Sequence, residues 1–126
     1  MIFDTDILIR HAQGDLDAAR AITKAESRQI ALQTALEYLQ GSSSNVLMSA
    51  RRSFLHDLEF EILPLTANIG HRALIYIEAH ALADGLRSAD ALIAATAVEN
   101  DEVLCTGNGK HFKAIKELKL KVLKGS

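Results

Sequence analysis

The chain opens with Met1-Ile2-Phe3-Asp4-Thr5-Asp6-Ile7-Leu8-Ile9. The short apolar run at the start predicts a buried strand, which ends where the first of two carboxylates, Asp4, appears. Open α/β sheets bind their ligands in the crevice beyond the carboxyl ends of their strands. We therefore expect Asp4 to lie where such a sheet does its chemistry. The alternative role for an acid at this position is a turn residue or a cap of the next helix.

The whole chain has the size and composition of one folded unit. It has 126 residues, of which 48% are hydrophobic, so we expect a single domain over residues 1–126 with a sizeable core. The single cysteine, Cys105, excludes an intrachain disulfide and fits a reducing cytoplasm. No run approaches the roughly 18 apolar residues that a membrane span needs. We therefore expect a cytoplasmic protein that does not contact a membrane.

Apolar runs alternate with helical patterns along the chain. Strands are predicted at 1–4, 29–33, 60–63, 102–106 and 119–123. Helices are predicted at 15–26, 34–41, 44–58, 66–83, 89–100 and 109–118, with Thr66 and Ser88 as N-caps. This alternation implies parallel strands that are covered by helices on both faces. We expect an α/β fold of three layers, with a central, mostly parallel sheet of four to five strands.

Two further carboxylates stand at comparable boundaries between elements. Glu37 follows a predicted strand, and Asp90 lies in the first turn of a predicted helix. Each has an ordinary structural explanation, because Thr34 and Glu37 have the spacing of a capping box and a helix dipole favours an acid in the first turn. Both nevertheless belong to the edge of the sheet at which Asp4 is expected.

The fourth predicted strand also ends in polar residues. Thr106 and Asn108 follow the apolar run that ends at Cys105, although a turn needs no other reason to contain Asn and Gly. Several carboxylates in one pocket do not all stay ionised unless a positive charge joins them. Mg²⁺ or Mn²⁺ takes oxygen ligands, and in phosphodiester cleavage such an ion activates water and offsets charge on the leaving oxygen. The residue types present are those that this chemistry needs.

Other kinds of active site have less support. The five histidines show no spacing typical of metal ligands, and no glycine-rich phosphate loop follows the first strand. Cys105 lies within an apolar run and is expected in the core. A haloacid-dehalogenase-type phosphatase also begins with an apolar strand and Asp-x-Asp, which Asp4 and Asp6 fit. That enzyme needs a later lysine and acidic pair, whereas Glu117 is the one acid after Thr106.

Four segments, taken in order, resemble the PIN domain family and, within it, the VapC-type toxins of prokaryotic toxin–antitoxin systems. The segments are Phe3-Asp4-Thr5-Asp6-Ile7-Leu8-Ile9, Thr34-Ala35-Leu36-Glu37-Tyr38-Leu39-Gln40-Gly41, Ser88-Ala89-Asp90-Ala91-Leu92-Ile93-Ala94-Ala95-Thr96-Ala97, and Leu104-Cys105-Thr106-Gly107-Asn108 with Phe112 beyond. The resemblance covers essentially the whole chain and implies a metal-dependent ribonuclease. By matching position, it implies Asp4, Glu37 and Asp90 as the acids that bind Mg²⁺ or Mn²⁺.

The same resemblance implies roles for neighbouring residues. Asn108 matches a fourth acidic position that is often Asn, and Thr106 matches a Ser or Thr that supports the acids by hydrogen bonding. Asp6 stands where the family usually has Asn, Gly107 where a bulkier residue is common, and His111 where an acid is frequent. With Asn108 in place of an acid, we expect one firmly bound metal and a second only with substrate.

The resemblance also implies three partners: an RNA substrate, an antitoxin whose tail covers the groove of the toxin, and a second copy of the chain in a homodimer. The six lysines between Lys110 and Lys124, together with Arg87, are candidates to attract an RNA backbone. The apolar residues between Arg51 and Leu63 are candidates for the antitoxin contact or for ordinary core.

One alternative function is not enzymatic. A degenerate PIN domain could serve as a binding module, and Asp6 and Asn108 are the features that favour it. Binding of Mg²⁺ or Mn²⁺ distinguishes this alternative from a nuclease.

Overall fold

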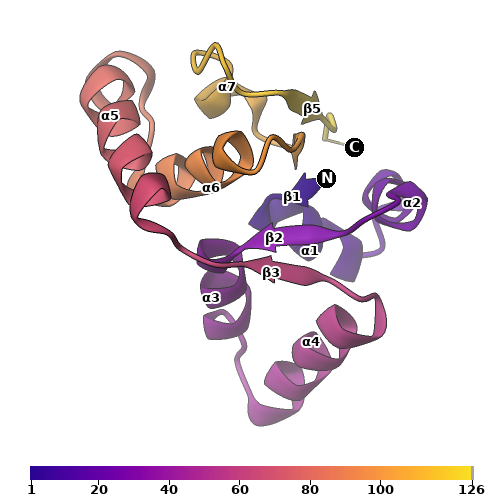
Figure 1. The fold of residues 1–126 in the computed structure, drawn as a ribbon. Helices are drawn as coiled ribbons and strands as arrows, with labels where there is room; N and C mark the ends of the chain where they lie inside the picture. Colours follow the sequence, from indigo (N-terminus) through magenta and orange to yellow (C-terminus); the bar gives the residue numbers. More distant parts are fainter. Residues whose placement is uncertain (126) are drawn as a thin grey trace.

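The computed structural model describes residues 1–125 and shows a three-layer α/β/α fold (Figure 1). Within these residues, one sheet is formed by the strands β1 (Ile2–Phe3), β2 (Gln29–Ala31), β3 (Glu61–Leu63), β4 (Leu104–Thr106) and β5 (Leu120–Val122). The strands are ordered β3-β2-β1-β4-β5, and all neighbouring pairs are parallel. The predicted fold class is confirmed, and each predicted strand is present.

Helices cover both faces of this sheet. In the described chain they are α1 (Thr5–Ala12), α2 (Leu16–Lys24), α3 (Leu32–Gln40), α4 (Asn45–Asp57), α5 (Ala67–Asp84), α6 (Ser88–Glu99) and α7 (Gly109–Phe112). The sequence pattern does not predict α1, because its apolar residues Ile7, Leu8 and Ile9 are consecutive and show no helical spacing. Among residues 1–125, no helix combines the length and the apolar character that crossing a membrane requires.

The ends of several helices differ from the prediction. The N-cap of α6 is Arg87, whereas Ser88 is the first residue of the helix. The helix predicted at 109–118 is confined to the four residues of α7, and turns follow it. The prediction for α5 is confirmed at its start, where the Thr66 hydroxyl accepts a hydrogen bond from Ile69 N at 3.2 Å.

The strands divide the core into two halves because their successive side chains point to opposite faces. Ile2, Ala31 and Leu104 pack with buried residues of α5, α6 and α7. On the other face, Phe3, Ile30 and Cys105 pack with buried residues of α1, α2, α3 and α4. Figure 1 shows these two helix groups on opposite sides of the sheet.

Helix α6 is buried around most of its circumference because its side chains are small. Its buried residues are Ala91, Ile93, Ala94, Ala95, Thr96 and Ala97. The close packing that small residues permit fixes the position of the helix against α5 and the sheet. Asp90, in the first turn of α6, is therefore attached to a helix that is packed on most of its sides.

Candidate active site

The candidate site lies where the direction of the chain through the sheet changes. From β1 the chain adds β2 and then β3 on one side, and it later adds β4 and β5 on the other. Ligands of open parallel sheets bind beyond the carboxyl ends of the strands at such a switch point. Phe3 is paired with Cys105, and Asp4 N donates to Cys105 O at 2.9 Å. This register brings Asp4 beside Thr106.

Asp4 is a buried carboxylate with two donors in contact. Its Oδ1 accepts from Thr5 N at 2.8 Å, and its Oδ2 accepts from the Thr106 hydroxyl at 2.7 Å. It therefore caps α1, as the alternative interpretation of the sequence had it, and also faces the switch point. Its side chain is only 7% exposed. Burial, and then the nearby charge of Asp6, raise the pKa of Asp4 from 3.8 to about 7 against the lowering effect of both hydrogen bonds.

Asp6 holds the loop after β4. Its Oδ2 accepts from Gly107 N at 2.9 Å, whereas its Oδ1 is buried and has no hydrogen-bond partner within the described residues. Burial raises the pKa of Asp6 above its ordinary value, although the Gly107 N–H and the charge of Arg10 oppose this. A Cβ at Gly107 would lie 2.5 Å from Asp6 Oδ2 and 2.8 Å from Arg10 Nη1. The close approach of these groups explains why glycine occupies this position.

Glu37 lies beside α1 and does not take part in a capping box. Helix α3 begins at Leu32, two residues before Thr34, so Thr34 is a fully buried helix residue and no side chain caps this end. The predicted capping box is wrong because the strand passes directly into the helix. Glu37 Oε1 is instead 3.0 Å from the hydroxyl of Thr5, which donates to it, and Thr34 Oγ1 is 3.2 Å from the same hydroxyl.

Asp90 and Asn108 meet around a residue that the sequence pattern did not select. His111 Nδ1 lies 3.2 Å from Asp90 Oδ2 and 3.1 Å from Asn108 Nδ2. Asn108 is itself fixed by its backbone N–H, which donates to Thr106 Oγ1 at 3.0 Å. Asp90, Asn108 and His111 line a polar hollow of about 450 Å³, whose other walls are Glu37, Arg87, Ser88 and Ala89.

The structure thus brings the six residues selected from the sequence to one edge of the sheet. Two chains of contacts connect five of them, whereas Glu37 contacts Thr5 and lines the hollow beside Asp90 and Asn108. One runs from Asn108 through Thr106 to Asp4, and Asp6 binds the same loop. The other joins Asn108 and Asp90 through His111. Sequence reasoning noted His111 only as a departure from a frequent acid and did not select it as a site residue, because its contact with Asp90 of α6 is tertiary.

The donor set suits a hard divalent cation. Asp4 and Asp6 are held close enough to each other, and to Asp90, for their charges to raise the pKa of Asp4, a cost that a cation would remove. The unpartnered Asp6 Oδ1 leaves one oxygen free for such a charge. Within residues 1–125, no three His, Cys, Asp or Glu side chains form a ready-made metal cage. A cation would therefore keep several water ligands, as Mg²⁺ commonly does.

Cys105 lies directly beneath the site but belongs to the core. Its side chain is fully buried in the middle of β4. Burial raises the pKa of the Cys105 thiol to about 11, so the thiol is neutral near pH 7. The expectation of a core residue rather than a nucleophile agrees with this environment.

Comparison with known proteins agrees with this architecture. The PIN domain family profile matches residues 1–118. A toxin–antitoxin complex from Klebsiella pneumoniae contains a chain with 28% identity, 93% coverage of both chains and a TM-score of 0.79. VapBC2 from Rickettsia felis, bound to a promoter DNA fragment, has 22% identity, coverage of 98% and 100%, and a TM-score of 0.73.

A third similar structure is VapBC-1 from nontypeable Haemophilus influenzae, with 21% identity, coverage of 97% of this chain and 98% of that one, and a TM-score of 0.77. A search of curated proteins gives no significant match. The family match sets aside the phosphatase alternative, because it extends over nearly the whole chain. On the sequence profile and the five-stranded parallel sheet together, the chain belongs to the PIN domain family.

Proposed function

We propose that the protein is a metal-dependent endoribonuclease and the VapC-type toxin of a toxin–antitoxin pair. PIN family membership and the similarity to a chain of the Klebsiella toxin–antitoxin complex support this assignment. The observation that carries the nuclease proposal is the buried Asp4, which is hydrogen-bonded to Thr106 and close to two further carboxylates at the switch point.

Asp4, Glu37 and Asp90 would hold Mg²⁺ or Mn²⁺, in part through water, with Asn108 nearby. The ion supplies charge compensation for the phosphodiester and a more acidic water. The remaining residues position these acids. The Thr106 hydroxyl fixes the orientation of Asp4, and Asp6 holds Gly107 N and therefore the loop that carries Asn108.

Basic residues near the hollow would bind the RNA backbone. Arg87 lines the hollow itself, and Lys110 lies in α7 directly before His111. All six lysines between Lys110 and Lys124 are exposed, although Lys119 lies before β5 and forms an ion pair with Asp101. Exposed cations beside an acidic site attract phosphate over a distance of about 10 Å at moderate salt, which brings the substrate to a site that would otherwise repel it.

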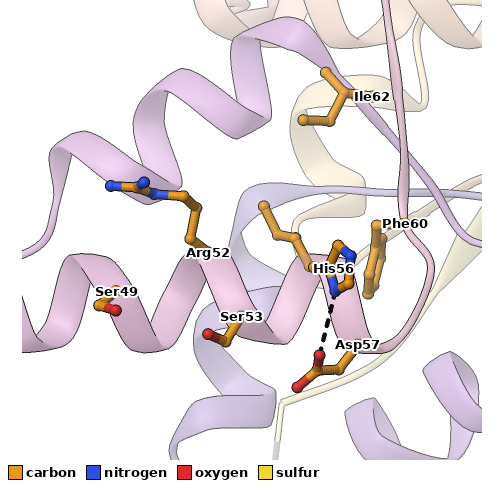
Figure 2. A pocket seen from close by; sticks show the side chains of 8 residues that line it. Ser49, Arg52, Ser53, His56, Asp57, Phe60 and Ile62 are labelled. Atoms are coloured by element: carbon orange, nitrogen blue, oxygen red, sulfur yellow. Dashed lines mark hydrogen bonds and ion pairs between the residues drawn. The ribbon is translucent and has the colours of Figure 1, made fainter.

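The antitoxin would contact the surface made by α4 and β3. The apolar residues predicted for this contact serve first as core, because Leu55 is buried and Phe54, Leu58 and Phe60 are half-buried against it. They leave a hollow of about 510 Å³, shown in Figure 2, and its lining is Ser49, Arg52, Ser53, Leu55, His56, Asp57, Phe60 and Ile62. Strand β3 is also an edge of the sheet, so an extended partner segment has backbone groups to pair with.

We also propose a homodimer in the cytoplasm. Helix α5 exposes Leu74, Ile75 and Leu82, three large apolar side chains that a second copy would cover. A free, buried Cys105 is compatible with a reducing compartment.

The nuclease proposal is tested by incubating purified protein with a mixed RNA pool, with and without Mn²⁺. We expect metal-dependent cutting that is lost in Asp4→Asn and in Asp90→Asn. Asp17→Asn is the matched control, because Asp17 is an exposed acid on α2, away from the site, and it should cut like the original chain. A fully active Asp4→Asn protein would refute the assignment.

A non-catalytic binding module is the second candidate function. The observation that favours it is that no three acidic, His or Cys side chains within residues 1–125 already form a metal cage. This candidate predicts no Mn²⁺ binding at millimolar concentration by calorimetry and no cutting under any condition.

A further inference from the structure

The backbone that carries His111 is held in place by contacts on both sides of the residue. It precedes Phe112, which is fully buried and anchors the short helix α7 in the core. Gly109 begins that helix so close to β5 that a Cβ there would lie 2.7 Å from Val122 Cγ2. At its other end, the loop is tied to Thr106 through Asn108 N. These contacts fix the backbone that carries the imidazole.

The imidazole of His111 contacts Asp90 and the side-chain amide of Asn108. Its side chain is 32% exposed, and its Nδ1 lies 3.2 Å from Asp90 Oδ2, whose side chain is 17% exposed. Two ligands at right angles on an octahedral ion, each about 2.1 Å from it, are about 3.0 Å apart. The oxygen of Asp90 and the nitrogen of His111 therefore already have nearly the separation of two neighbouring ligands of one ion.

We propose that His111 is a nitrogen ligand of the divalent cation that Asp90 holds. This inference rests on the metal site of the proposed function and adds a residue to it. Mg²⁺ prefers oxygen ligands, whereas an imidazole nitrogen is a good ligand for first-row transition ions. The nitrogen therefore shifts the selectivity of the site away from Mg²⁺ and towards ions such as Mn²⁺.

His111 could instead position Asp90 without binding the ion, and this arrangement differs from coordination in the state of its ring nitrogen. If His111 only positioned Asp90, its Nδ1 would carry a hydrogen and donate it to the carboxylate, and the ion would have oxygen ligands alone. If His111 coordinates, the lone pair of a ring nitrogen is bound to the ion. Magnetic coupling between a bound Mn²⁺ and the nitrogen nucleus distinguishes the two arrangements without reference to activity.

The test compares the original chain with His111→Ala, His111→Asp and His56→Ala by Mn²⁺ and Mg²⁺ titration and by pulsed electron paramagnetic resonance. His56 is the matched control, because it is an exposed histidine on α4. We expect directly coordinated nitrogen in the original chain and in His56→Ala, and none in the two His111 variants. The dissociation constant for Mn²⁺ should rise about tenfold in His111→Ala, and that for Mg²⁺ less than about threefold.

His111→Asp replaces the nitrogen ligand with a carboxylate oxygen. The variant should bind Mg²⁺ like the original chain and still lack the nitrogen coupling. Mn²⁺ bound without nitrogen coupling in the original chain, or with coupling that persists in His111→Ala, would overturn the inference and leave the oxygen site intact. An original chain that binds no Mn²⁺ at all would overturn the proposed metal-dependent function together with the inference.

Discussion

Asp4 is the residue whose ionisation depends most on what occupies the site. Its pKa is about 7 in the folded, metal-free chain and close to 3.8 when unfolded. Between these values the folded state retains a proton that the unfolded state has lost, so stability falls as the pH rises from about 4 to about 7. The loss is at most about 4 kcal/mol, since each pKa unit corresponds to about 1.4 kcal/mol.

Asp4→Asn should remove this pH dependence. We expect the metal-free variant to be at least about 1 kcal/mol more stable than the original chain at pH 8, and closer to it at pH 4.5. Urea unfolding of metal-free protein at both pH values provides the measurement. Adding Mn²⁺ should stabilise the original chain and not the variant. Parallel pH profiles for the two proteins would contradict this interpretation.

Gly107 tests the contact between the loop and Asp6. In Gly107→Ala the new methyl group would meet Asp6 Oδ2 at 2.5 Å, so the loop must move and weaken the hydrogen bond from residue 107 N. We expect a loss of about 1–3 kcal/mol in unfolding free energy and a clear loss of RNA cleavage. Gly70→Ala is the matched control. Nothing lies within 4 Å of its new methyl group in α5, so the unfolding free energy of this variant should rise by about 0.5–1 kcal/mol.

Helix α5 illustrates how much an N-cap contributes to one element. Thr66 Oγ1 accepts from Ile69 N, and Thr66→Ala would leave that N–H without its partner. We expect a decrease of about 1 kcal/mol in unfolding free energy, measured by urea denaturation. Thr66→Ser keeps the hydroxyl and should stay within a few tenths of a kcal/mol of the original chain. Equal losses in both variants would show that the methyl group, not the cap, is what matters.

The strands could be predicted from the sequence more completely than the helix ends. Buried parallel strands are short apolar runs, as β1 and β4 are, whereas the edge strands β3 and β5 are mostly exposed and contain Glu61 and Lys121. Helix α1 could not be recognised from the sequence, because Ile7 and Leu8 form a consecutive apolar pair without helical spacing, and Asp4 serves both as the strand-end acid and as the N-cap. Thr34 and Glu37 have the spacing of a capping box, yet the backbone of β2 enters α3 two residues earlier.

The site was predictable as far as the parallel sheet determines it. The approach of Asp4 and Thr106 follows from β1 and β4 being neighbours, which strand-end polar residues suggest. The contacts of Asp6 with Gly107, and of Arg10 with the carbonyls of Leu123 and Lys124, depend on how α1 packs against the carboxyl edge. No local pattern carries that information, because Asp6 and Arg10 lie in α1 while their partners lie in loops more than 100 residues further along the chain.

The arrangement of charge over the whole molecule sets the last expectation. The net charge is −2, yet the acids of the candidate site are half-buried or buried while the lysines that follow β4 are exposed. Substrate would therefore meet the lysines first. Because each phosphate contact lowers the slope of log affinity against log salt by about 0.7 for single strands, three lysines account for a slope of about 2.

Replacing Lys110, Lys113 and Lys116 together with Gln should make the salt dependence of RNA binding shallower by about 2, with little effect on folding. Binding is measured by fluorescence anisotropy between about 50 and about 300 mM salt, a range over which screening changes strongly. The measurement uses an Asp90→Asn background so that the RNA stays intact. Replacing Arg20 and Lys24, which are exposed on α2, should leave the slope unchanged. An equal slope in the triple variant would assign the attraction of RNA to Arg87 and the site itself rather than to the lysines.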